Sequence, residues 1–127
     1  MRFHANHVSA SAAGDYYQLW LGARDSNEEK TDPHQATGPY LIVQRDFEMP
    51  DGGRCYVETH DASYVGHFWL RLIEFCPTRL AFEIQRKKDN HVEVSFAMEQ
   101  SEFLETRRIV QVIFGEREPD PEPDDAL

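Results

Sequence analysis

The stretches Leu80-Ala81-Phe82-Glu83-Ile84-Gln85 and Val92-Glu93-Val94-Ser95-Phe96-Ala97-Met98 decide the fold class that we expect for this chain. In both, large apolar side chains alternate with polar or small ones. Because successive side chains of a β-strand point to opposite faces, this period of two is typical of strands that bury one face and expose the other. Residues 16–23 and 40–48 show the same alternation, and turn residues separate the runs. The pattern therefore predicts an antiparallel sheet system.

The expected fold class is mainly β (α+β): an antiparallel meander of about seven to eight strands, sandwich-like or a partly closed barrel, with a C-terminal helix. Residues 1–115 are expected to form a single globular domain, because 127 residues are close to the common domain size. Residues 1–14 either add an edge strand or are loose. Residues 116–127 are rich in proline and acidic residues, which predicts a disordered acidic tail.

The segment 99–114 fits two structures. Ser101 resembles a helix N-cap, Gly115 resembles a stop signal, and Phe103 and Val110 would share one helical face. The β-branched run 109–113 instead favours a strand. We expect a helix because both end signals agree and a sheet face needs a cover.

Residues 49–53, Met-Pro-Asp-Gly-Gly, predict a hairpin turn that places Phe47 opposite Cys55. Residues 66–75 are expected to form one strand beside residues 55–60, with Thr59 opposite Phe68.

Leu72 and Phe82 are expected to share the buried face, which requires an odd number of turn residues, so residues 77–79 should form the turn. In this register Cys55 and Cys76 both face the core. They stand roughly 13 Å apart along the strands, which is too far for a disulfide.

This register predicts one polar and aromatic surface on three adjacent strands, with His60 opposite His67. Tyr, Trp, Arg and carboxylate groups on one face are typical of a protein-binding surface. A merely solvated sheet face, or a face covered by the final helix, would use the same residues. The candidate binding residues are Gln44, Asp46, Tyr56, Glu58, His60, His67, Trp69 and Arg71.

Other chemistry has weaker signals. His60 and His67 with Glu58 or Asp61 could hold zinc, but their spacing matches no recognised zinc motif. Asp46 and Glu58 could form an acid–base pair for a hydrolase. We find no phosphate-binding, dinucleotide-binding or serine-hydrolase motif, so we expect no cofactor, no metal and no catalytic residue.

The net charge of −10 narrows the class of partner. Residues 116–127 carry six acidic residues and one basic residue, and residues 1–115 carry 17 acidic and 12 basic ones. An acidic body disfavours nucleic acid and anionic membranes, and it permits a basic protein partner. Acidity that only maintains solubility is the simpler interpretation. No secretory signal or run of about 20 apolar residues is present, so we expect a cytoplasmic protein.

The runs Leu41-Ile42-Val43-Gln44-Arg45 and Tyr56-Val57-Glu58, then Gly66 and a final apolar segment ending in Ile113-Phe114-Gly115, resemble small bacterial immunity proteins that accompany polymorphic or contact-dependent toxins. The resemblance covers residues 40–115. It implies a cytoplasmic protein that binds and blocks a cognate, basic toxin without catalysis. The 25–34 loop would join the sheet face in that contact.

Three other functions stay open. A meander that closes around a cavity would be a calycin-like binder of small molecules. A small hydrolase or isomerase would need surface carboxylates or His in a concave site. An exposed edge strand would permit a homodimer.

Overall fold

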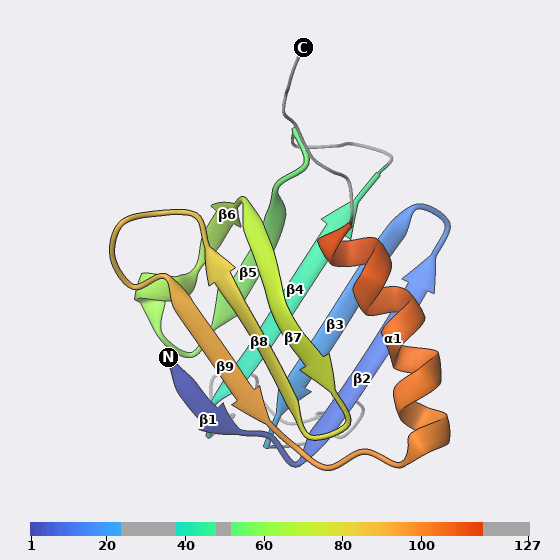
Figure 1. Ribbon diagram of the computed structural model, residues 1–127. Coiled ribbons are helices and arrows are strands. Elements are labelled where there is room, and N and C mark those ends of the chain that lie inside the picture. The colour runs from blue at the N-terminus through green and yellow to red at the C-terminus, as the bar shows by residue number, and fades with distance from the viewer. Residues whose placement is uncertain (24–37, 48–51, 116–127) are drawn as a thin grey trace.

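A computed structural model describes residues 1–23, 38–47 and 52–115, and shows two sheets packed face to face beside one helix (Figure 1). The five-stranded sheet has the order β2 (His7–Ala13), β3 (Tyr16–Gly22), β4 (Tyr40–Asp46), β5 (Cys55–Thr59) and β6 (Gly66–Phe68). The four-stranded sheet has the order β1 (Arg2–His4), β9 (His91–Ser95), β8 (Arg79–Ile84) and β7 (Leu70–Cys76). Neighbouring strands are antiparallel, except that β1 and β9 are parallel.

The predicted class, a mainly β sandwich with a C-terminal helix, is confirmed. The described residues form nine strands rather than seven or eight, because residues 1–14 supply both β1 and β2, and the stretch expected to be one strand at residues 66–75 supplies both β6 and β7. Among these residues neither sheet closes into a barrel. The tail predicted for residues 116–127 lies outside the described residues.

The core lies between the two sheets. The predicted buried positions Val57, Phe82 and Val94 belong to one cluster and are fully buried, and Leu70 packs against its rim. The alternation therefore identified the buried side of β5, β8 and β9 and of the start of β7. Val57 lies on the five-stranded sheet, whereas Phe82 and Val94 lie on the four-stranded sheet, so the buried faces of the two sheets meet, which is how a sandwich buries both apolar faces.

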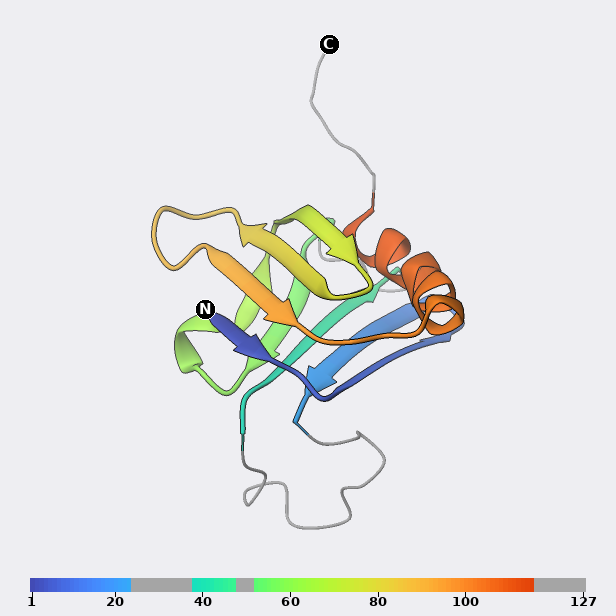
Figure 2. The same cartoon turned by 60° about the horizontal axis from the view of Figure 1, so that its bottom comes forward.

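Helix α1 (Gln100–Phe114) lies beside the sandwich and contacts β2, β3, β4 and β7 (Figures 1 and 2). Its side chains reach the core, since Phe103 stacks on Phe75 at 5.1 Å and Phe114 meets Phe82 at 5.3 Å between ring centroids. The helix therefore packs on the inner side of the five-stranded sheet and does not cover its outer face. The stop at Gly115 is confirmed, because its N–H donates to the Gln111 carbonyl at 2.9 Å. The cap prediction was wrong: Glu99, not Ser101, precedes the helix.

The predicted strand registers were wrong, although the faces were right. Val43 pairs with Val57, a shift of two residues from the predicted pairing. Tyr56 pairs with His67, a shift of four residues. Even shifts keep every side chain on its own face, so the burial pattern could not reveal them. The turn residues 48–51 lie outside the described residues.

Residues 66–75 are not one strand. The chain leaves the five-stranded sheet after Phe68 and enters the four-stranded sheet at Leu70. Phe68 and Leu70 both pack against the core, so the alternation continues unbroken across the change of sheet.

The predicted turn at residues 77–79 is one residue shorter, because Cys76 pairs with Arg79. A bulge at Ile73 adds one residue to β7, which compensates for the shorter turn and keeps the apolar side chains of the two strands on the same face. Ile73 itself is 47% exposed. After this bulge Cys76 is half-buried and pairs with the exposed Arg79, so it does not face the core as predicted. No disulfide joins Cys55 and Cys76.

Candidate binding surface

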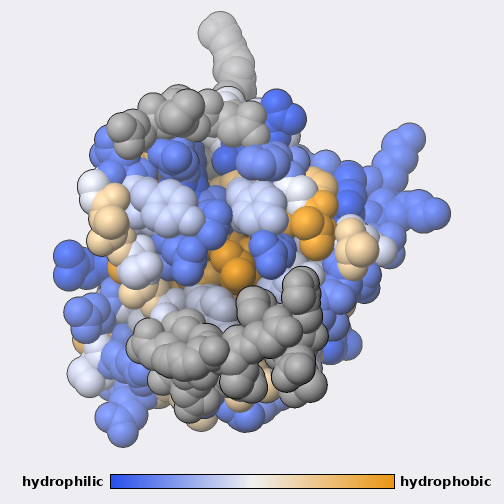
Figure 3. Space-filling view, turned by 180° about the vertical axis from the view of Figure 1, so that it is seen from behind, coloured by the Kyte–Doolittle hydropathy of each residue, from blue (hydrophilic) through white to orange (hydrophobic). Residues whose placement is uncertain are grey.

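The outer side of the five-stranded sheet carries a continuous set of aromatic and polar side chains (Figure 3). It is built from the outward-pointing positions of β3, β4, β5 and β6, which the strand registers bring side by side. In Figure 3 pale aromatic rings lie beside an apolar centre, with hydrophilic groups around them. We call this surface the tyrosine face; it consists of Tyr16, Gln18, Trp20, Tyr40, Ile42, Gln44, Asp46, Tyr56, Glu58 and His67.

Glu58 is held at the centre of the tyrosine face by two phenols. The Tyr40 and Tyr56 hydroxyls each donate to one Glu58 carboxylate oxygen at 2.9 Å. Burial, with the Glu58 hydrogen bond second, raises the pKa of Tyr40 to about 12. The Glu58 hydrogen bond is the main cause of the raised pKa of Tyr56. Both phenols therefore stay protonated and keep donating at neutral pH.

A second hydrogen-bonded group spans β3 and β4. The Gln44 side-chain amide donates to the Gln18 side-chain oxygen at 2.7 Å, and the Tyr16 hydroxyl donates to the same oxygen at 3.2 Å. Burial, followed by the nearby Asp46 charge, raises the pKa of Tyr16. These contacts fix the side chains before any partner arrives, which lowers the entropy that binding must overcome.

Trp20 and Ile42 form the apolar part of the surface, since they are cross-strand partners at its middle. The Trp20 ring lies over Gly22, where an added Cβ would stand 2.5 Å from the ring. Glycine at this position therefore lets the indole lie flat on the sheet.

The two histidines predicted to face each other do not. His67 lies beside Tyr56, with 5.2 Å between ring centroids. His60 follows directly after β5, and its Nδ1 accepts a hydrogen bond from the Tyr40 backbone N–H at 3.2 Å. Over residues 1–23, 38–47 and 52–115, no group of three or more His, Cys, Asp or Glu is placed to hold a metal ion.

The acid–base pair considered for Asp46 and Glu58 is not formed either. Glu58 pairs with Ile42, four residues before Asp46, so the backbone positions of the two residues stand roughly 13 Å apart along the strands.

Two of the eight predicted binding residues lie away from this surface. Trp69 sits at the crossing between the sheets, is 50% exposed and packs over Gly53. Arg71 belongs to β7 and forms an ion pair with Glu83 at 2.7 Å, on the four-stranded sheet. The other six lie on or beside the tyrosine face: Gln44, Asp46, Tyr56, Glu58, His60 and His67.

The sequence interpretation missed the part of the surface that β3 and the start of β4 supply. Tyr16, Gln18 and Trp20 alternate with buried residues, so the outward positions were visible. Fourteen undescribed residues, 24–37, separate β3 from the strand to which it pairs. Alternation shows which face of a strand is buried but not which strand lies beside it. With fourteen residues between β3 and β4, the sequence did not predict that these two strands pair.

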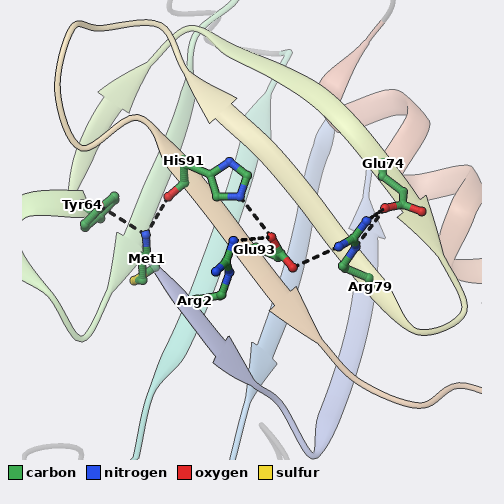
Figure 4. Close-up of polar contacts among 7 residues, drawn as sticks. All are labelled: Met1, Arg2, Tyr64, Glu74, Arg79, His91 and Glu93. Atoms are coloured by element: carbon green, nitrogen blue, oxygen red, sulfur yellow. Dashed lines mark hydrogen bonds and ion pairs between the residues drawn. The ribbon is translucent and has the colours of Figure 1, made fainter.

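The outer face of the four-stranded sheet differs because its charges satisfy one another (Figure 4). Glu93 accepts hydrogen bonds from His91 and Arg79, both at 3.1 Å, and pairs with Arg2 at 3.3 Å. These contacts, led by the His91 hydrogen bond, lower the pKa of Glu93. Arg79 also pairs with Glu74. A charged partner would have to break these pairs, whereas the hydrogen-bond partners of the Glu58 side chain within the described residues are two neutral phenols.

No protein-family model matches this sequence, and no curated protein is significantly similar to it. Within the part of the chain that the structure describes, no helix combines the length and apolar character that crossing a bilayer requires.

Proposed function

We propose that this chain is a non-enzymatic binding protein that holds a basic protein partner on the tyrosine face, in the manner of an immunity-type inhibitor. The observation that carries the proposal is the state of Glu58. It is a carboxylate fixed by two phenols, and it forms no ion pair with the described residues. A partner's lysine or arginine would supply the missing cation.

The surroundings of Glu58 support the same proposal. Tyrosine and tryptophan carry much of the energy of protein interfaces, because they bury large area and lose few rotamers. Here Tyr40, Tyr56 and Trp20 are all half-buried in the free protein and already oriented. The net charge of −10 would steer a basic partner toward the chain.

No comparable observation supports a calycin-like binder or a hydrolase. A calycin-like binder depends on a closed meander, and the two sheets stay open along their edges in the described residues. A hydrolase using Asp46 with Glu58 would need two facing carboxylates, and these two residues are offset by four positions along the sheet.

The test is a matched pair of variants. Wild-type protein captures its partner from an extract of the source cells, and association of the purified partner is then followed at several salt concentrations. Glu58→Gln should slow association and flatten its salt dependence, and should weaken binding at least ten-fold, because a desolvated charge pair is lost. Glu83→Gln removes the same charge from the other sheet. It should leave the association rate, its salt dependence and the affinity unchanged.

If Glu58→Gln and Glu83→Gln bind the partner with the same rate and affinity, the tyrosine face is not the binding surface. The inhibitor form makes a further demand: the captured protein must arrest growth when produced alone and must be harmless when this chain is coproduced.

A further inference from the structure

We propose that a groove between β2 and the first half of α1 binds an extended segment of a partner protein that carries lysine or arginine side chains on one face, and that this segment joins the five-stranded sheet beside β2. This surface is separate from the tyrosine face and does not depend on the function proposed above. β2 is the end strand of the five-stranded sheet, so one of its edges pairs with no strand of the described residues.

The shape of the groove points to the backbone edge of β2. Two adjoining hollows, of about 330 and 280 Å³, lie between β2 and the helix. The second is lined by three consecutive residues of β2, Val8, Ser9 and Ala10. Consecutive side chains point to opposite faces of a sheet, so a hollow that touches all three must run along the strand's edge.

β2 also lacks the features that normally protect an edge strand. It pairs with β3 over seven consecutive positions without a bulge, and its sequence, His-Val-Ser-Ala-Ser-Ala-Ala, contains no lysine or proline. Such a strand presents a regular row of backbone N–H and C=O groups, which an extended peptide can extend by hydrogen bonding.

The helix side of the groove selects the chemistry of the occupant. Glu102 lines both hollows and Glu105 lines the second; both are exposed and neither forms an ion pair with the described residues. These carboxylates favour a cationic segment over a second copy of this chain, which carries a net charge of −10. The floor is apolar, from Val8, Ala10 and Ile109, which pack against the core.

Thr106 is an independent sign of a ligand. It lines the second hollow and is only 7% exposed, yet its hydroxyl makes no hydrogen bond within the described residues. A buried hydroxyl without a partner costs free energy, and a polar group of a bound segment would satisfy it.

The test uses a capped, fluorescently labelled peptide of alternating lysine and threonine residues, which places all lysines on one face of a strand. We expect it to bind the full chain and to slow hydrogen exchange of the β2 amides that do not pair with β3. Glu102→Gln and Glu105→Gln should each weaken binding about two- to five-fold, the range for an exposed ion pair. Thr106→Val should also weaken it. Glu58→Gln should leave peptide binding unchanged, which separates this inference from the tyrosine face.

Two N-methylated peptides separate strand addition from simple charge attraction. Alternate backbone N–H groups of an added strand face β2, so methylation in one phase should abolish binding and methylation in the other should spare it. Equal binding by both peptides would overturn the inference, as would failure of the parent peptide to bind at millimolar concentration. Sedimentation that shows a dimer, together with β2 amides that are already protected from exchange without the peptide, would assign the edge to a second copy and would also overturn the inference.

Discussion

At the scale of single residues, Glu58 shows how a charge can be oriented without being neutralised. Phenol donors fix both carboxylate oxygens but leave the negative charge in place. The ion-paired Glu93 on the opposite side of the sandwich is oriented as well, but its charge is offset by Arg2 and Arg79. The difference between these two carboxylates is the physical basis for assigning partner binding to one sheet face and not to the other.

Alkaline titration tests the Tyr40–Glu58 contact at this scale. A pKa raised from 10 to about 12 means that folding favours the protonated phenol. Its contribution to stability is therefore complete below pH 10 and is lost as the pH rises through about 12. The difference in tyrosinate absorption between the wild type and Tyr40→Phe isolates the signal of Tyr40. We expect this signal to titrate near pH 12. Glu58→Gln should lower that midpoint, because the charge and its strong acceptor are gone.

The lowered midpoint should not reach that of a free tyrosine, since burial is the largest cause of the shift and the variant keeps it. A midpoint that does not change in Glu58→Gln would mean that the carboxylate does not accept from Tyr40 in solution.

At the scale of elements, the two ends of α1 differ in how well the sequence predicts them. A glycine marked the true C-terminal end, whereas a serine suggested an N-terminal end at the wrong residue. Gly115 ends α1 with φ of 55° and ψ of 160°, a conformation that side chains disfavour. Ser101 has the chemistry of a cap but stands as the second residue inside the helix, where it is exposed. The stop signal was therefore reliable because it rests on sterics, whereas the cap signal rests on a side-chain hydrogen bond that this helix does not use, since Glu99 at the N-cap makes none.

We expect Gly115→Ala and Gly115→Asn both to lower the free energy of unfolding by about 1–3 kcal/mol, because neither side chain is compatible with this backbone region. Ser101→Ala should change it by less than about 0.5 kcal/mol. Denaturant unfolding measures both. A loss of about 1 kcal/mol in Ser101→Ala would mean that Ser101 is the true cap.

At the scale of the whole molecule, the sandwich and the helix share one core. Phe82 lies fully buried on β8, faces the inner side of the other sheet and meets Phe114 of α1. The helix thus fills the side of the sandwich that the smaller sheet leaves uncovered, and it forms one wall of the β2 groove.

Phe82→Ala should therefore lower the free energy of unfolding by about 3–5 kcal/mol, the range for removing a buried aromatic side chain. Leu104→Ala, on the same helix as Phe114 but 43% exposed, should cost less than about 1 kcal/mol. Both should unfold in a single transition if sheets and helix form one cooperative unit. A separate unfolding transition of the helix in Phe82→Ala would mean that the sheets and the helix do not unfold as one cooperative unit.

The sequence by itself determined which side of β5, β8 and β9 is buried, that most strands pair antiparallel, and where the last helix stops. Those properties follow from alternation and from sterics within a few residues, as at Val57, Phe82 and Gly115. Only the tertiary structure decided which strands are neighbours, where β6 ends and β7 begins, and that Tyr40 and Tyr56 meet at Glu58. The reason is that even register shifts, a bulge at Ile73 and a crossing between sheets all preserve the apolar pattern, so contacts across strands choose among arrangements that look identical along the chain.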